Sequence, residues 1–542
     1  MGWFTRSVAV CLAAPMLAAC ATVPDGVSPN VGGLPGAGSS APSAAAHPQA
    51  EPIPDNCEVD AARPKRQMRA AWITTVRNID WPSKPGLSVK KQQDELVAQL
   101  DRAAELRLNA VFFHVRPTAD AVYASDKEPW ARYLTGKQGG DPGYDPLEFA
   151  TAEAHKRGIE LHAWFNPYRV GWKDPDLDGL VADHPVKRHP DWLITYDKQG
   201  FFDPGNPDAR NWVTSVVLDV VKRYDVDGVH FDDYFYPYPA EGETFDDDAS
   251  WEAHGDGFDD RDDWRRDNVD QLIADIDDGI EQSKPWVQFG VSPFGIWRNK
   301  NTDDSGSATS GLQSYDALNA DTRAWIQAGT IDYVVPQLYW HQGFATADYA
   351  KLVPWWADEV EGTDVDLYIG QAPYRVGESN WTGKDALSRQ LDFNRDHSAV
   401  TGDVYFSMKD LSGKAREATE HLVERHYGRP ALPPVANGAQ DAPAPVAGLA
   451  AERTDGGAEL VWNVADGDLM YAVYRVPGQG DDLCALADAA NLVAVVGAPD
   501  GGEARYLDAD APAEAAAYYV TALDVYRSES APGDGALISD GE

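Results

Sequence analysis

The chain has 542 residues, enough for about three domains or for one large domain with a smaller one. Hydrophobic residues make up 43% of it and aromatic residues 11%, so it can bury a core, and global disorder is excluded. The formal net charge of −41 repels phosphate groups, which argues against nucleic acid as a partner.

The first twenty residues contain a short apolar run that ends at a cysteine. A single positive charge at Arg6 precedes an apolar run over 7–19, which suits a secretion signal and is too short for a permanent membrane span. The run ends in Leu-Ala-Ala-Cys at 17–20, which resembles the lipobox, where the cysteine receives a lipid. We expect a signal peptide over 1–19, a lipid on Cys20 and a membrane-anchored protein of the cell envelope on the extracytoplasmic side. An ordinary signal peptide is the alternative.

Residues 20–62 are rich in Pro, Gly, Ala and Ser, which predicts a flexible tether after the lipidated cysteine. Four cysteines are too few for a disulfide scaffold. We therefore interpret Cys57, at the end of the tether, as a free thiol in preference to a bridge to Cys484.

Between residues 63 and 428, short β-branched or aromatic runs alternate with helical patterns. The predicted strands are 69–76, 110–116, 160–166, 228–234, 287–293, 333–339, 367–373 and 404–408. A capping box with proline at the first helical position begins a helix at Asp145. Eight strand–helix units predict an α/β fold, a (β/α)8 TIM barrel with parallel strands. A doubly wound open sheet is the alternative, weakened because no Gly-rich phosphate loop follows a strand.

The residues after 428 have a different composition. Pro, Gly and Ala dominate 429–445, which predicts a linker that few contacts cross. Residues 446–535 show short alternating runs, and Trp462 and Tyr518 suit the core of a small all-β sandwich. This segment resembles a fibronectin type III module.

The candidate site lies where the barrel strands end, because active sites of such barrels lie at that face. Asp232 and Asp233 end the fourth predicted strand, and adjacent carboxylates there are costly to bury unless they function or find partners. Aromatic faces and polar groups at the other strand ends suit a sugar, with its apolar C–H side and its hydroxyls. The predicted substrate-binding residues are Trp72, His114, Arg116, Trp164, Asn166, Tyr168, Asp203, His230, Tyr234, Gln337 and Tyr339.

Six ordered motifs carry a more specific resemblance. They are MRAAWI at 68–73, FHVRP at 113–117, HAWFNPY at 162–168, FDPGNP at 202–207, DGVHFDDYFYP at 227–237 and VPQLYW at 335–340. Over roughly residues 65–428 the chain resembles the glycosyl-hydrolase-like family 10 of bacterial lipoproteins. The resemblance implies a barrel that hydrolyses O-glycosidic bonds of peptidoglycan, the cell-wall glycan, particularly strands stripped of their peptides.

Glycoside hydrolysis normally uses two carboxyl groups, one to protonate the leaving oxygen and one as nucleophile or base. Asp232 is our first candidate and Asp233 our second, while Asp203, Asp303 and Asp304 are possible proton donors. The fourth strand is similar to the chitinase-like D-G-x-D-x-D-x-E pattern. However, Tyr234 stands at the position of its Glu and His230 at that of its first inward Asp, which puts substrate-assisted catalysis in doubt.

Two other functional classes stay open at this point. An inactive barrel could bind glycan and position other wall enzymes. A metal-dependent phosphodiesterase would need acidic and His ligands on several strand ends, and the first strand has none.

The acidic segment 246–263 lacks EF-hand spacing, so we interpret it as solvated. We predict no metal and no cofactor; the expected partners are cell-wall glycan and, through the lipid, a membrane.

Overall fold

A computed structural model of the protein describes residues 53–54, 57–60, 63–171, 177, 179–439, 441–480, 482–499 and 501–540. The predicted signal peptide, Cys20 and most of the predicted tether lie outside the described residues. Within the described part of the chain, no helix combines the length and the apolar composition needed to cross a bilayer.

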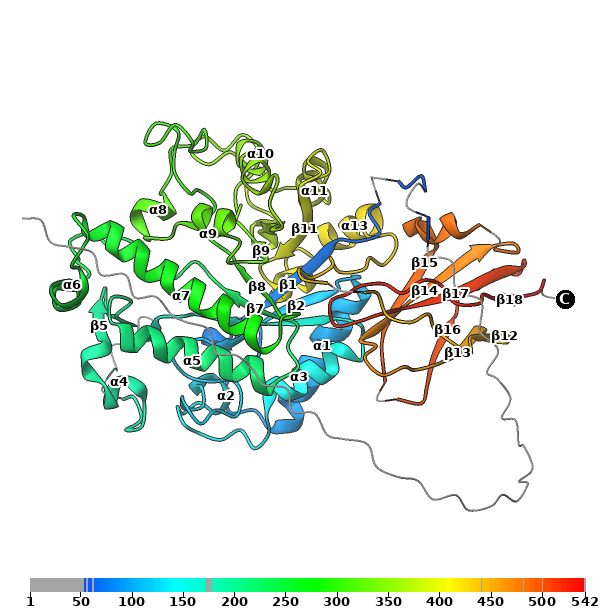
Figure 1. Ribbon diagram of the computed structural model, residues 1–542, viewed down its shortest axis with the longest axis horizontal. Helices are drawn as coiled ribbons and strands as arrows, with labels where there is room; N and C mark the ends of the chain where they lie inside the picture. The colour runs from blue at the N-terminus through cyan, green and yellow to red at the C-terminus, as the bar shows by residue number, and fades with distance from the viewer. Residues whose placement is uncertain are drawn as a thin grey trace, which may run out of the picture. The chain divides into compact units, whose positions relative to one another are not determined.

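Eight parallel strands form a closed barrel (Figure 1). In chain order they are β1 (Met68–Ile73), β2 (Ala110–Arg116), β3 (Glu160–Phe165), β7 (Gly228–Phe231), β8 (Gln288–Val291), β9 (Tyr333–Val334), β10 (Asp366–Gln371) and β11 (Val400–Tyr405). The ring closes because β1 pairs with both β2 and β11. The predicted (β/α)8 barrel is therefore confirmed, and the doubly wound open sheet is excluded.

The last barrel strand begins earlier than the sequence pattern predicts, at Val400 instead of 404. Gly402 and Asp403 obscure it, because glycine and aspartate are depleted in strands. Gly402 lies opposite Met68 of β1, where a Cβ atom would come within 2.5 Å of the Met68 Cβ. The close approach of the two strands explains why glycine occupies this position.

Helices lie between and after the barrel strands. They are α1 (Val89–Glu105), α2 (Arg132–Thr135), α3 (Pro146–His155), α4 (Pro185–Arg188), α5 (Pro207–Arg223), α6 (Asp248–His254), α7 (Arg261–Ser283), α8 (Ser314–Ala317), α9 (Thr322–Ala328), α10 (Tyr349–Val360), α11 (Ser388–Asn394), α12 (Met408–Ser412) and α13 (Arg416–His426). The longer helices bury an apolar face, as α5 does with Val213, Val216 and Val220. Helix α3 begins as predicted, since the Asp145 side chain accepts hydrogen bonds from the backbone N–H groups of Leu147 and Glu148.

A small antiparallel sheet, which the sequence pattern does not predict, follows β3. Its strands, in spatial order, are β4 (Arg169–Gly171), β6 (Gln199–Phe202) and β5 (Leu193–Tyr196). Strands this short are difficult to recognise because they show too little alternation. The sheet places Arg169 next to the end of β3.

Two antiparallel sheets form the C-terminal domain. One has the order β12 (Ala450–Thr454), β13 (Gly457–Asn463), β16 (Glu503–Asp508), and the other β15 (Leu492–Gly497), β14 (Met470–Pro477), β17 (Ala516–Leu523), β18 (Ala536–Ile538). Trp462 of the first sheet and Tyr471 and Tyr518 of the second are buried in a shared core. The predicted all-β fold of this part is confirmed.

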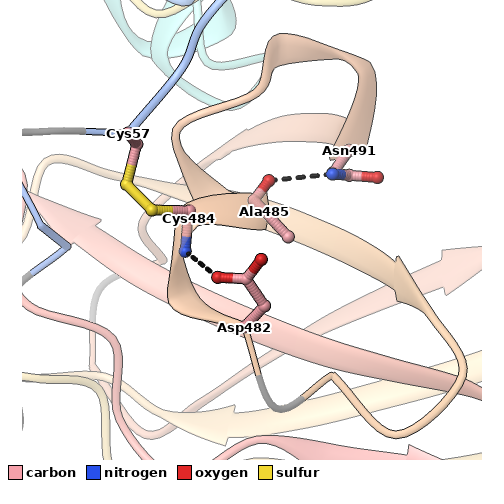
Figure 2. The surroundings of a disulfide bond; sticks show 5 residues. All are labelled: Cys57, Asp482, Cys484, Ala485 and Asn491. Atoms are coloured by element: carbon pink, nitrogen blue, oxygen red, sulfur yellow. Dashed lines mark hydrogen bonds between the residues drawn. A yellow bond between two sulfur atoms is a disulfide. The ribbon is translucent and has the colours of Figure 1, made fainter.

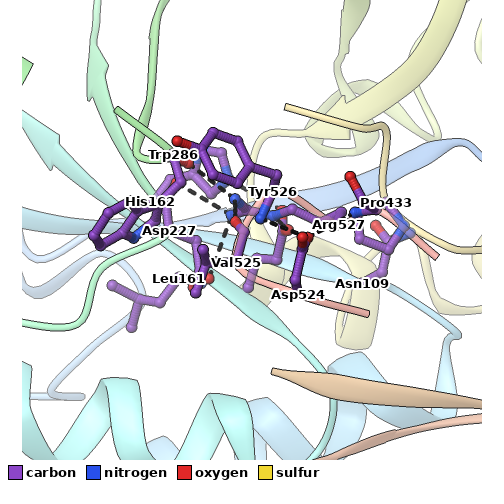
Figure 3. A network of polar contacts seen from close by, with 12 residues as sticks. Asn109, Leu161, His162, Asp227, Trp286, Pro433, Asp524, Val525, Tyr526 and Arg527 are labelled. Carbon is purple, nitrogen blue, oxygen red and sulfur yellow. Dashed lines mark hydrogen bonds and ion pairs between the residues drawn. The ribbon is translucent and has the colours of Figure 1, made fainter. Parts of the chain in front are cut away.

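Contacts between the barrel and the C-terminal domain contradict the prediction that few would cross the linker. Arg527, in the turn after β17, is 0% exposed and forms ion pairs with Glu160, at the start of β3, and with Asp227, directly before β7. Figure 3 shows its guanidinium beside Asp227 and Trp286. Leu432 of the linker is also buried, and its N–H donates to the Lys65 carbonyl at 2.9 Å. Proline-rich composition reports an extended backbone and says nothing about its packing.

A disulfide joins Cys57 to Cys484 (Figure 2), so the interpretation of Cys57 as a free thiol is wrong. The two cysteines lie 427 residues apart, and only the tertiary structure brings them together. Nearby, Ile53 packs on the apolar cluster that contains Met470, and Lys65 forms an ion pair with Glu529 at 2.8 Å. The segment that precedes the barrel is therefore fastened to the C-terminal domain.

The acidic segment 246–263 is only partly solvated, which corrects our interpretation. Asp247 is buried and forms ion pairs with Arg265 at 2.7 Å and Arg261 at 3.3 Å. Asp260 caps α7 by accepting two backbone hydrogen bonds. Across the described residues, His, Cys, Asp and Glu side chains form no group of three or more suited to a metal ion.

Candidate active site

The carboxyl ends of the barrel strands surround a pocket of about 400 Å³. It brings together seven of the predicted site residues, namely Trp72, Trp164, Asp232, Asp233, Tyr234, Gln337 and Tyr339. Other lining residues escaped prediction: Arg169, Tyr238, Ser292, Phe294, Trp340, Tyr374, Arg375 and Phe406. The pocket is of the size and aromatic character of a site for a small organic ligand or a sugar.

Asp232 lies directly after β7 and is held by its neighbour Asn166. The Asn166 side-chain N–H₂ group donates to both Asp232 carboxylate oxygens, each at 3.0 Å. The orientation of the Asn166 amide is fixed, because its oxygen accepts a hydrogen bond from the Arg169 backbone N–H at 2.8 Å. Asn166 itself is fully buried and does not line the pocket, so the structure places it behind Asp232 and not where a substrate would touch it.

Asp233 is held by two side chains that line the pocket. Its Oδ1 accepts a hydrogen bond from the Gln337 side chain at 3.0 Å, and its Oδ2 accepts one from the Tyr238 hydroxyl. Gln337 is fixed in turn, because its N–H₂ group also donates to the Ser292 carbonyl at 2.9 Å. Adjacent residues of a regular strand point apart. Here the strand ends at Phe231, so both carboxylates can face one pocket.

Burial makes the two carboxyl groups hard to ionise together. Removal from water raises the pKa of Asp232 to about 6, the Arg169 charge opposes this rise, and the Asp233 charge adds to it. Burial likewise raises the pKa of Asp233, while hydrogen bonds from Tyr238 and Gln337 oppose the rise. At mildly acidic pH the pair therefore holds both a carboxylic acid and a carboxylate.

Two of the predicted substrate-binding residues, His230 and His114, lie behind the side chains that line the pocket. The His230 ring is fully buried and accepts a hydrogen bond from the Trp72 indole N–H at 3.2 Å. The His114 ring is also fully buried and stacks on Trp164, with 3.8 Å between the ring centroids. Both imidazoles therefore support aromatic side chains that line the pocket, and burial lowers the pKa of each well below its usual value.

Three further predicted site residues point elsewhere. Arg116 is fully buried in a bidentate pair with Glu128, at 2.7 and 2.6 Å. Tyr168 is part of the barrel's apolar core, and Asp203 is buried with its carboxylate accepting from Ser250 and the Gly205 backbone. Of the proposed proton donors, none of Asp203, Asp303 and Asp304 lines the pocket.

Sequence reasoning missed residues for which a signal was present. Arg169 follows Asn166 by three residues at the end of the third predicted strand, and Tyr238 follows Asp233 by five residues. The Arg169 guanidinium lies over the Tyr234 ring, 4.1 Å from its centroid, which is cation–π geometry. Phe406, directly after β11, packs against Trp72 with 6.0 Å between centroids, but its place in the wall follows only from closure of the barrel.

Comparison with known proteins agrees with this geometry. The model of the glycosyl hydrolase-like 10 family matches residues 67–387, more than half of the chain. The chain belongs to this family. With two paired carboxyl groups in an aromatic pocket, it is a glycoside hydrolase.

Two curated glycosyl hydrolases are similar to the chain over much of its length. Glycosyl hydrolase YngK of Bacillus subtilis is 49% identical over 378 residues, which cover 69% of this chain and 74% of that protein. Glycosyl hydrolase DigH of Escherichia coli K12 is 41% identical over 382 residues, covering 66% and 87%. Among solved structures, an endo-1,4-β-mannanase from Rhizomucor miehei aligns at 12% identity with a TM-score of 0.42, covering 67% of this chain and 98% of that one.

Proposed function

We propose that this glycoside hydrolase cleaves the glycan strands of peptidoglycan from which the peptides have been removed, while a lipid on Cys20 holds it at a membrane. The observation that carries the hydrolytic part is the pair Asp232 and Asp233 in one pocket at the barrel mouth. The motifs of the barrel support the substrate, because the family that they resemble implies it. The lipobox-like residues 17–20 support the anchor.

The surroundings of the two carboxyl groups favour different roles for them. Tyr238 and Gln337 each donate to one oxygen of Asp233, and hydrogen bonds of this kind stabilise a carboxylate. Among the described residues, Asp232 accepts only amide hydrogen bonds, from the Asn166 side chain at both oxygens and from the Tyr234 backbone N–H at 3.3 Å, and burial raises its pKa to about 6. We therefore assign Asp232 as the acid that protonates the leaving oxygen and Asp233 as the nucleophile or base.

The pocket wall suits the sugar units on either side of such a bond. Trp72 and Trp164 present rings that are held from behind by His230 and His114. Held rings can cover the C–H face of a pyranose without losing side-chain entropy on binding. Gln337 and Tyr234 line the same pocket and supply polar groups for hydroxyls.

The central experiment compares the wild-type protein on purified wall glycan with and without peptides, reading the products by mass spectrometry. We expect shortened glycan fragments from peptide-free strands. Absence of cleavage of both substrates, with binding retained, would replace hydrolysis by the binding-module alternative.

Variants of the two carboxyl groups test the assigned roles. Asp232→Asn and Asp233→Asn should each lower kcat on glycan strands at least about a thousandfold, because each removes one of two required carboxyl groups. An aryl glycoside with an activated leaving group needs no proton, so Asp232→Asn should retain activity on it and Asp233→Asn should not. The opposite pattern would exchange the roles.

A further inference from the structure

The wall of the pocket across from the carboxyl pair carries a second guanidinium, that of Arg375. Arg375 follows β10, and in the barrel β8 and β9 separate that strand from β7, which precedes the carboxyl pair. Arg169, in contrast, follows β3, a direct neighbour of β7. The two arginines therefore approach the pocket from different sides, and only Arg169 adjoins the reacting groups.

Local contacts orient Arg375 but use only part of its hydrogen-bonding capacity. One terminal N–H group donates to the Tyr339 carbonyl at 2.8 Å, and Nε donates to the Glu378 carboxylate at 3.0 Å. Glu378 is 44% exposed, and ion pairs of this kind contribute little because water screens them. A guanidinium has five N–H donors, so donors remain for a ligand in the pocket.

Aromatic side chains flank Arg375 on the same wall. Tyr339 and Tyr374 pack edge to face with 5.8 Å between their ring centroids, and Trp340 also lines the pocket. Rings beside a planar cation form a site that covers a sugar and binds a carboxylate in bidentate fashion. The formal net charge of the protein is −41, so an anionic ligand needs a local cation such as the Arg375 guanidinium to attract it to the pocket wall.

We propose that Arg375, with Tyr339, Trp340 and Tyr374, forms a subsite for a sugar that bears a carboxylate. This inference rests on the proposed function and deepens it. The N-acetylmuramic acid units of wall glycan carry a lactyl ether, whose carboxylate is free when the peptide is absent and becomes a neutral amide when the peptide is attached. The guanidinium would bind the free carboxylate and so select strands without peptides.

The test uses two forms of the same peptide-free strands, one with free lactyl carboxylates and one in which coupling to methylamine has made them neutral amides. Wild-type protein should prefer the free acid about tenfold to a hundredfold in kcat/KM, the usual effect of a charge-assisted hydrogen bond. Arg375→Gln should lose that preference, because cleavage of the acid slows far more than cleavage of the amide. Arg375→Lys should keep part of it, since lysine retains the charge without the planar fork.

A matched control is Arg416→Gln, which removes an exposed arginine whose Nε bonds Glu420 at 3.0 Å, as Arg375 bonds Glu378. It should leave both substrates unaffected. An unchanged melting temperature shows that Arg375→Gln is folded. Equal cleavage of the two strands by the wild type, or an equal loss on both in Arg375→Gln, overturns the subsite and leaves the proposed hydrolysis standing.

Binding measurements distinguish a failure of the proposed subsite from a failure of the proposed hydrolysis. Affinity of the Asp233→Asn protein for each strand, measured by calorimetry, reports the subsite without cleavage. If the wild type cleaves neither strand but Asp233→Asn binds the free acid more tightly, and the added substitution Arg375→Gln abolishes the difference, the subsite stands and the proposed hydrolysis fails. If the two strands bind equally, the subsite is wrong.

Discussion

Replacement of Arg527 should weaken the contact between the barrel and the C-terminal domain. Arg527 reaches from the C-terminal domain to Glu160 and Asp227 at the amino-terminal ends of two barrel strands (Figure 3). Burial opposes ionisation of Asp227, but the charges of His155 and Arg527 lower its pKa to about 2, so it is a carboxylate at neutral pH. Arg527→Met removes the guanidinium and roughly preserves the volume of the side chain.

The expected loss of unfolding free energy depends on which carboxylate has no other ion-pair partner once Arg527 is removed. Asp227 keeps the His155 imidazole at 2.8 Å, whereas Glu160 keeps only a 3.4 Å contact with His162. Breaking a buried ion pair by removal of one partner costs about 3–5 kcal/mol, because the other charge stays buried. We expect Arg527→Met to lower the free energy of unfolding by that amount. Adding Glu160→Gln removes the stranded charge and should restore part of it, with a coupling of about 1–3 kcal/mol.

Urea unfolding followed by fluorescence of the 18 tryptophans measures these changes. Arg505→Met is the matched control, because Arg505 lies in the same domain and pairs with Glu459 on the surface at 3.3 Å. Its midpoint should equal that of the wild type. A wild-type midpoint in Arg527→Met, or no recovery in the double variant, would refute the view that this buried pair holds the C-terminal domain on the barrel.

Three further outcomes are expected. Because Asp232 must carry a proton and its pKa is raised to about 6, kcat/KM on glycan strands should fall about tenfold per pH unit above that value; a pH profile that stays flat to pH 8 would contradict the assignment. Cys484→Ser should lower the free energy of unfolding by about 2–4 kcal/mol, because the disulfide closes a very long loop in the unfolded chain. Equal unfolding midpoints of this variant and the oxidised wild type would show that the bridge adds no stability. Cys20→Ala should move the protein from the membrane fraction to the soluble fraction and abolish labelling by a lipid precursor; retention of both would disprove the anchor.

Local sequence patterns were sufficient for the existence of the eight barrel strands, although they did not reveal the small sheet of β4, β5 and β6. Strand and helix periodicity is a property of neighbouring residues, so runs such as 110–116 and 160–166 locate β2 and β3 to within a residue. The rule that barrel sites lie at the carboxyl ends of strands then places Asp232 and Asp233 at the mouth. The same rule could not separate Trp164, in the pocket wall, from His114 behind it, because both end barrel strands.

Contacts between distant parts of the chain were decided only by the tertiary structure. Arg527 and Glu160 are 367 residues apart, and neither has a local pattern that reveals its partner. Arg375 and Asp233 line the same pocket because the eight strands close into a ring. Closure brings the carboxyl ends of β10 and β7 to the same mouth of the barrel. Local propensities act over a few residues, whereas the pairing of a buried charge or the wall of a pocket depends on which surfaces the closed barrel leaves facing one another.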